Sequence, residues 1–73
     1  MLRLRAERLK RKMTIRELSR RSGIAESTLS NLERGRVHPW PAYRRKLAKI
    51  FHVKADLLFT EMPEADDQAR ASR

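Results

Sequence analysis

Polar side chains that donate and accept hydrogen bonds gather on one face of a predicted helix over residues 25–34. Helical periodicity places four residues on the side that can face a core: Ala25, Thr28, Leu29 and Leu32. The opposite side carries Ser27, Ser30, Asn31 and Arg34. Hydroxyl, amide and guanidinium groups of this kind suit recognition by hydrogen bonding, for example at the edges of nucleic-acid bases. We therefore expect the function to lie on this outer face.

The sequence contains no set of residues that is typical of catalysis. No nucleophile stands beside a base, no glycine-rich loop suits a phosphate, and no carboxylates are paired for acid–base work. The two histidines, His38 and His52, are far apart in the sequence and have no Cys or tight carboxylate cluster nearby, which argues against a metal site. We expect neither an enzyme nor a bound cofactor or metal.

The chain requires neither an oxidising compartment nor a membrane. It has no Cys, which excludes disulfides and Cys-ligated metal sites, so a reducing cytoplasm is the expected location. The longest apolar run near the C-terminus covers residues 57–59, far short of the roughly 18 residues of a membrane span. We expect no membrane partner.

The distribution of charge indicates a polyanionic partner. The 73-residue chain has a net charge of +9, and residues 1–60 hold 16 Lys and Arg against 5 Asp and Glu, whereas residues 61–73 hold 2 against 4. A basic domain of this kind most often binds nucleic acid. The alternative is a charged surface that only keeps the protein in solution.

Local signals predict two short helices joined by a tight turn, which together position the polar face. Thr14 as N-cap and Glu17 three residues later match a capping box at the start of the first helix. Gly23 suits the positive φ that ends this helix, and Gly35 ends the next one. Two helices separated by a glycine turn are the pattern of a helix-turn-helix.

Three further helices complete the predicted domain over residues 1–60. The first spans residues 2–12 with three apolar residues, Leu2, Leu4 and Leu9, and Met13 follows as a core residue. The fourth begins at Trp40 and Pro41 and turns Leu47, Ile50 and Phe51 inward, and the fifth covers residues 55–59. We interpret Trp40 as packing on the fourth helix, with a DNA-facing or dimer-facing role as the alternative. Residues 61–73 are polar and are predicted to be disordered.

The segment over residues 14–35 resembles the Cro and lambda-repressor-like family of helix-turn-helix regulators, also called the Xre type. Within that segment the resemblance is carried by Leu18, Gly23, Ile24, Leu29, Glu33 and Gly35. Outside it, the matching residues are Leu4, Arg8, Pro39, Leu47, Ala48, Phe51, Val53, Asp56 and Leu58. The resemblance implies a compact all-α, five-helix domain whose third helix enters the DNA major groove while the second lies across the backbone.

Carried over by position, the resemblance implies two sets of DNA-contacting residues. The base-contact candidates are Glu26, Ser27, Thr28, Ser30 and Asn31. The phosphate-contact candidates are Thr14, Arg16, Arg34, Arg36 and His38. Asn suits adenine N6 and N7, Ser suits several base edges, and Glu suits cytosine N4, which is independent support for the first set. The alternative for each of these residues is an ordinary solvated helix face.

The sequence departs from the family at several positions. Ile15 stands where a Gln often touches a phosphate, so this contact is missing or is made by Arg16 instead. Ala25 stands where Ser or Thr is usual, and Lys12 and His52 stand where Gly is common.

The resemblance also implies a structural ion pair and a dimer. Arg8 and Glu33 occupy positions that form a semi-buried pair in the family, and the alternative is two independently solvated side chains. A homodimer on an inverted repeat follows from the family, and our candidates for its interface are the apolar residues of the fifth helix region: Leu57, Leu58 and Phe59.

We expect a sequence-specific regulator of transcription that binds double-stranded DNA, acts as a repressor and is associated with the nucleoid when bound. A second hypothesis is an antitoxin or adaptor of the same fold that acts mainly through a protein partner. A third hypothesis is an RNA or non-specific nucleic-acid binder. The positive charge permits it, but the sequence lacks the aromatic platform on which the bases of a single strand would stack.

Overall fold

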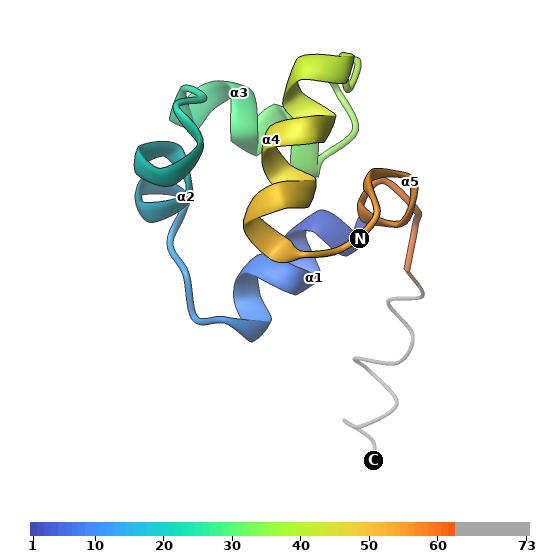
Figure 1. The fold of residues 1–73 in the computed structure, drawn as a ribbon, viewed down its shortest axis with the longest axis horizontal. Coiled ribbons are helices and arrows are strands. Elements are labelled where there is room, and N and C mark those ends of the chain that lie inside the picture. Colours follow the sequence, from blue (N-terminus) through green and yellow to red (C-terminus); the bar gives the residue numbers. More distant parts are fainter. Residues whose placement is uncertain (63–73) are drawn as a thin grey trace.

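Five helices make up the fold in the computed structural model, which describes residues 1–62 (Figure 1). They are α1 Arg3–Lys10, α2 Ile15–Ser22, α3 Glu26–Glu33, α4 Pro41–Phe51 and α5 Ala55–Leu58. In Figure 1, α2 lies on one side of α4 and α5 on the other. The predicted all-α, five-helix class is confirmed. The predicted disordered tail lies, from residue 63 on, outside the described residues.

One apolar core joins all five helices and two of the loops. Its buried members are Leu4, Met13, Leu18, Ile24, Leu29, Leu32, Leu47, Phe51 and Leu58. Met13 comes from the loop before α2 and Ile24 from the loop before α3. Both are buried, which confirms the predicted core position of Met13. Helices of 4 to 11 residues are unstable alone, so this shared packing holds them in place.

Two apolar residues of the predicted helices are exposed and do not join the core. Ala25 was placed on the inward stripe of the third helix, but α3 begins at Glu26 and Ala25 is its exposed N-cap, without a side-chain cap. Leu9 remains 45% exposed because α1 turns Leu4, Glu7 and Arg8 inward instead. α1 is also shorter than predicted at both ends.

Lys12 and His52 adopt the left-handed backbone conformation, with φ of 54° and 56°. These are the two positions where the family resemblance leads one to expect glycine. Side chains with a Cβ are disfavoured in this region, so both turns are strained relative to a glycine turn.

The N-terminal segment runs beside residues 60–62. The amide of Arg3 donates to the carbonyl of Thr60 at 2.9 Å, and the amide of Met62 donates to the carbonyl of Met1 at 2.7 Å. Leu2 and Glu61 form an antiparallel bridge, and the amino group of Met1 pairs with the Glu61 carboxylate. The boundary predicted at residue 60 falls inside this contact, and the described fold continues to Met62.

Candidate nucleic-acid interface

The start of α2 is fixed by the capping box that the sequence predicted. The Glu17 amide donates to Thr14 Oγ1 at 3.0 Å, and the Thr14 amide donates to Glu17 Oε1 at 3.3 Å. These two bonds satisfy backbone donors that a helix start leaves open. The direction of α2 is therefore set by its own sequence.

A hydrogen-bonded turn fixes α3 against α2. Gly23 ends α2 with φ of 76°, as predicted, and its amide donates to the Ser19 carbonyl at 2.8 Å. The Ser19 hydroxyl donates to the Ile24 carbonyl at 2.6 Å, and the Ile24 amide donates to Ser22 Oγ at 3.1 Å. Because Ile24 is also buried in the core, the turn has little freedom, and α3 is held at a defined angle.

α3 presents the five base-contact candidates to solvent. Glu26 and Ser27 are exposed, whereas the remaining three are half-buried: Thr28, Ser30 and Asn31. The inward side of the helix is formed by Leu29, Leu32 and Glu33. Apart from Glu26, none of the five side chains makes a hydrogen bond or ion pair within residues 1–62. The outer face of α3 therefore offers uncommitted donors and acceptors.

Among the base-contact candidates, only Glu26 forms an ion pair within residues 1–62. Arg16 Nε lies 3.9 Å from Glu26 Oε2, and both side chains are more than half exposed. An exposed pair at this distance contributes little to stability, so either partner remains available for another contact. Glu26 also lies in the first turn of α3, where its negative charge interacts favourably with the helix dipole.

All five phosphate-contact candidates are exposed: Thr14, Arg16, Arg34, Arg36 and His38. Arg34 and Arg36 lie on either side of Gly35, whose φ of 73° ends α3. The Arg36 amide donates to the Asn31 carbonyl at 2.9 Å, which holds the loop close to the helix end. Basic side chains thus follow the polar face of α3 directly along the chain.

Trp40 does not pack on α4 as we interpreted it. It is the N-cap of α4 and is 58% exposed, and its ring lies edge to face with the His38 ring, with the two ring centroids 4.3 Å apart. The prolines on both sides favour the extended backbone that Trp40 adopts, with φ of −59° and ψ of 153°.

The ion pair expected between Arg8 and Glu33 is present and buried. Arg8 Nε lies 2.7 Å from Glu33 Oε2, and Arg8 Nη2 donates to Glu33 Oε1 at 3.2 Å. Arg8 Nη1 also donates to the Met13 carbonyl at 2.8 Å. The pair therefore ties α1 to the end of α3 and to the loop before α2, and it fixes both ends of the helix-turn-helix.

A second buried charge, Glu7, was missed by the sequence reasoning. It is 5% exposed and accepts hydrogen bonds from Arg11 at 2.5 Å and from Arg3 at 3.0 Å. The hydrogen bond from Arg11 holds the pKa of Glu7 below its ordinary value of 4.5, with Arg3 helping and burial opposing. The spacing of Arg3, Glu7 and Arg11 by four residues was the signal that could have revealed it.

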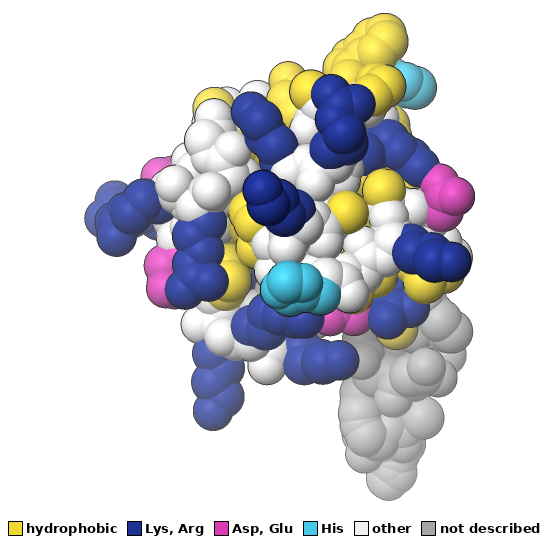
Figure 2. Space-filling model, in the orientation of Figure 1, with side chains coloured by type: hydrophobic (Ala, Val, Ile, Leu, Met, Phe, Trp, Pro, Cys, Tyr) yellow, Lys and Arg dark blue, Asp and Glu magenta, His cyan; other side chains and the backbone are white. Residues whose placement is uncertain are grey.

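Some of the basic residues stabilise the fold through contacts of their own. Arg11 also donates to the Phe51 carbonyl at 3.0 Å and lies over the Phe51 ring. Arg44 pairs with Asp56 and lies over the Phe59 ring. Figure 2 shows Lys and Arg side chains spread over the whole face that it draws, and α4 itself carries exposed Arg45, Lys46 and Lys49, so the positive charge is not confined to α2 and α3.

Of the dimer candidates, Leu58 is excluded from any surface. It is 0% exposed because α5 turns it into the core, whereas Leu57 is 43% exposed and Phe59 is half-buried. The expectation that all three residues would share an interface is therefore wrong for Leu58.

Comparison with known proteins agrees with this architecture. The sequence model of the helix-turn-helix family of the Cro and C1 type matches residues 4–58, which include all five helices but for the first residue of α1. Searches of the curated proteins and of the solved structures returned no match. No helix within residues 1–62 has the length and apolar character needed to cross a bilayer. The match, the turn geometry and the exposed polar face agree, and the chain belongs to the Cro/C1-type helix-turn-helix family of DNA-binding transcription regulators.

Proposed function

We propose that this protein is a sequence-specific repressor that binds an inverted repeat in double-stranded DNA as a homodimer, with α3 in the major groove. The observation that carries the proposal is the outer face of α3. There three polar side chains, Ser27, Ser30 and Asn31, have no hydrogen-bond partner within residues 1–62, and the same is true of the half-buried Thr28 at the edge of this face. The helix itself is held against the core by Leu29 and Leu32.

The chemistry of this face suits base recognition. The Asn31 amide can form two hydrogen bonds with one adenine, and the Ser27 hydroxyl can donate or accept at several base edges. Glu26 can accept from cytosine N4, and it would first have to leave Arg16, which costs little at an exposed site. Phosphate contacts from the basic side chains around α3 would set the register of the helix in the groove.

A homodimer would place two copies of α3 about 34 Å apart, which is one turn of the duplex. Leu57 and Phe59 remain candidates for the contact between the two copies, since both retain exposed apolar surface. A dimer seated over a promoter would repress simply by occupying it.

The proposal is tested by selecting duplexes from a random library and measuring binding of the winner and of a scrambled duplex over a salt series. We expect a palindromic winner that binds at least about a thousandfold tighter than the scramble at physiological salt. Near-equal binding with a steep salt dependence would contradict sequence-specific recognition and leave only a basic surface.

A specific observation favours one rival, an adaptor of the same fold that acts through a protein partner. Trp40 is a large, exposed aromatic residue in the loop after α3, and such residues are enriched at protein interfaces. Substitution Trp40→Ala distinguishes the two functions. If the protein is the proposed repressor, the variant still prefers the selected duplex over the scramble. If the protein is an adaptor, the variant no longer binds its protein partner, and neither the variant nor the wild type prefers a particular duplex.

A further inference from the structure

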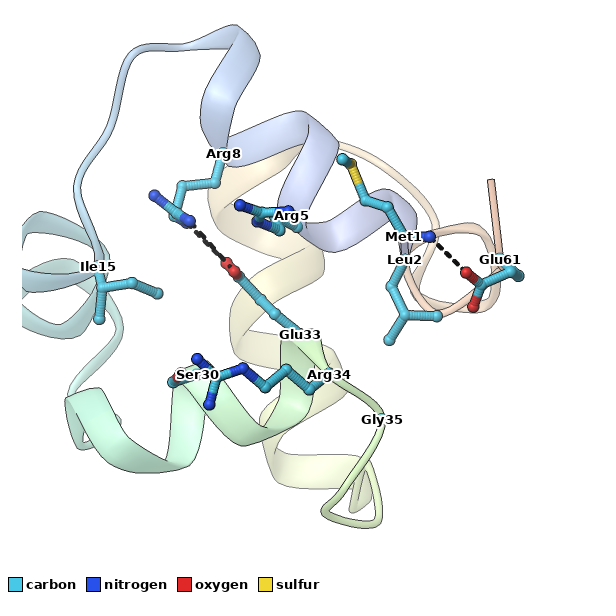
Figure 3. A pocket seen from close by; sticks show the side chains of 10 residues that line it. All are labelled: Met1, Leu2, Arg5, Arg8, Ile15, Ser30, Glu33, Arg34, Gly35 and Glu61. Atoms are coloured by element: carbon cyan, nitrogen blue, oxygen red, sulfur yellow. Dashed lines mark hydrogen bonds and ion pairs between the residues drawn. The ribbon is translucent and has the colours of Figure 1, made fainter. Parts of the chain in front are cut away.

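A cleft of about 560 Å³ opens beside the C-terminal half of α3, between this helix and the start of α1 (Figure 3). Arg5 and Arg8 line it from α1, Ser30 and Glu33 line it from α3, and Arg34 lies at the end of α3. Arg5 belongs to neither set of DNA-contact candidates that the sequence suggested. The cleft therefore contains a residue whose role the proposed function leaves open.

The cleft is lined by more positively than negatively charged side chains. Arg8 is fully engaged, since its guanidinium contacts both oxygens of Glu33 and the Met13 carbonyl. Arg5 and Arg34 are exposed, and neither has a carboxylate within 4.0 Å among residues 1–62. In the view of Figure 3, the Glu33 side chain runs between them toward Arg8. Two carboxylates also line the cleft, of which Glu33 is paired with Arg8 and Glu61 with the amino group of Met1. The guanidinium groups of Arg5 and Arg34 thus face the cleft without a counter-charge of their own within residues 1–62.

Such an arrangement favours an anion with several acceptor oxygens. Two positive charges that share a cleft repel each other, and an anion that accepts from both relieves this repulsion. The planar fork of a guanidinium group matches the geometry of phosphate oxygens. The Ser30 hydroxyl makes no hydrogen bond within residues 1–62, so it is a third donor at the same cleft.

The position of the cleft identifies the source of the phosphate. Ser30 and Arg34 are four residues apart and follow one face of α3, next to Asn31 on the outer face. With α3 in a major groove, a group bound in this cleft would lie at the rim of the groove, where the DNA backbone runs. We propose that the cleft binds one phosphate of the DNA backbone between the guanidinium groups of Arg5 and Arg34. This inference rests on the proposed function.

The first test measures the salt dependence of DNA binding for Arg5→Ala and Arg34→Ala. Loss of one phosphate contact should lower the slope of log K against log salt by about 0.9 and weaken binding about fivefold at 0.15 M salt. The affinities for the selected and for the scrambled duplex should fall by the same factor, because a phosphate contact carries no sequence information. Thermal unfolding should be unchanged, since both side chains are exposed and unpaired.

The matched control is Arg45→Ala on α4, which removes an exposed arginine that also has no carboxylate partner within residues 1–62. It lowers the net charge equally but lies outside the cleft, so its effect on the slope should be smaller. If Arg5→Ala and Arg45→Ala change affinity and slope alike, Arg5 acts only through general charge and the proposal is overturned.

A second arm locates the phosphate and separates DNA from a free anion. Single neutral methylphosphonate linkages are placed along the selected duplex, and one of them should weaken binding by the wild type but not by Arg5→Ala. Inorganic phosphate is tested as a competitor against chloride at matched ionic strength. Competition by phosphate that Arg5→Ala abolishes, without an effect at any linkage, would replace the DNA backbone by a free anion and overturn the proposal.

Failure of the proposed function would be seen separately. If no duplex is preferred in the selection, sequence-specific recognition fails, yet the salt slopes on any duplex still compare Arg5→Ala with Arg45→Ala. If a duplex is preferred but the slopes of these two variants coincide, only the assignment of the cleft fails.

Discussion

α1 and α3 are both eight-residue helices rich in polar side chains, yet several of these side chains lie in opposite environments on the two helices. On α1, Glu7 and Arg8 are less than 10% exposed, and their charged groups are matched by ion pairs and hydrogen bonds. On α3, the side chains of Ser27 and Asn31 reach solvent and make no hydrogen bond within residues 1–62. Polar residues that are buried and paired maintain the fold, and those that are exposed and uncommitted are the ones available to a ligand.

The largest effect is expected on stability, when the buried ion pair between Arg8 of α1 and Glu33 of α3 is removed. Glu33→Ala leaves the Arg8 charge buried without its partner, so unfolding should become easier by about 3–5 kcal/mol, a fall in Tm on the order of 15 °C. Thermal unfolding followed by circular dichroism measures it. The control Glu26→Ala, which breaks only the exposed pair with Arg16, should cost less than about 1 kcal/mol.

A double-mutant cycle sharpens the same point. The coupling energy between Arg8→Ala and Glu33→Ala should be large, because each single change strands the other charge. A coupling near zero would mean that the two side chains act independently, and the buried pair would then not be what joins the helices.

The next largest effect is expected when Asn31 is changed, and it should weaken DNA binding while leaving stability unchanged. Asn31→Ala should weaken binding to the selected duplex by about 1–3 kcal/mol, because a bidentate base contact is lost. Anisotropy titrations measure the affinity, and Tm should stay within the error of the wild type. Lys46→Ala on α4 is the control, since it removes an exposed side chain away from α3. A fall in Tm without a change in specificity would place Asn31 among the residues that maintain the fold.

A smaller effect is expected on the free energy of unfolding at acidic pH. The pKa of Glu7 is lower in the folded protein than its ordinary value of 4.5, so its ion pairs stabilise the fold above that pH. This contribution should be lost as the pH falls from about 4.5 through the lowered pKa. Glu7→Gln should therefore unfold more easily at pH 7 by about 1–2 kcal/mol and approach the wild type at low pH.

Denaturant titrations from pH 7 down to the acid limit measure this difference. Glu26→Gln, an exposed carboxylate on α3, should run parallel to the wild type. A constant gap between Glu7→Gln and the wild type at all pH values would show that packing, and not charge, is what Glu7 contributes.

The smallest effect involves no side-chain partner. Lys12→Gly and His52→Gly relieve the left-handed backbone at the turns after α1 and α4, and each should stabilise the protein by up to about 1 kcal/mol. Ala6→Gly, in the middle of α1, should instead destabilise by about that amount. If all three substitutions destabilise, the side chains of Lys12 and His52 contribute contacts that outweigh the strain.

The sequence predicts best what is decided locally. Thr14 with Glu17 specifies the start of α2, and Gly23 specifies its end, because both signals depend on residues within one turn of each other. The resemblance to the family was sufficient for the pairing of Arg8 with Glu33, although 25 residues separate them.

What could not be predicted depends on packing between distant segments. Leu58 and Phe59 are adjacent in the sequence, but only the arrangement of α5 against the core decides that the first is buried. Trp40 looked like a packing residue because it is large and apolar, and the loop geometry leaves it outside. The cleft between Arg5 and Arg34 arises only when α1 is laid beside the end of α3.

The exposure of Trp40 has a spectroscopic consequence. It is the only tryptophan of the chain, so intrinsic fluorescence reports on this single loop without any label. Free protein should emit at the long wavelengths of a hydrated indole. A shift to shorter wavelength as the protein is concentrated would show a second copy covering the loop after α3, whereas a change only on addition of a duplex would show that DNA reaches it.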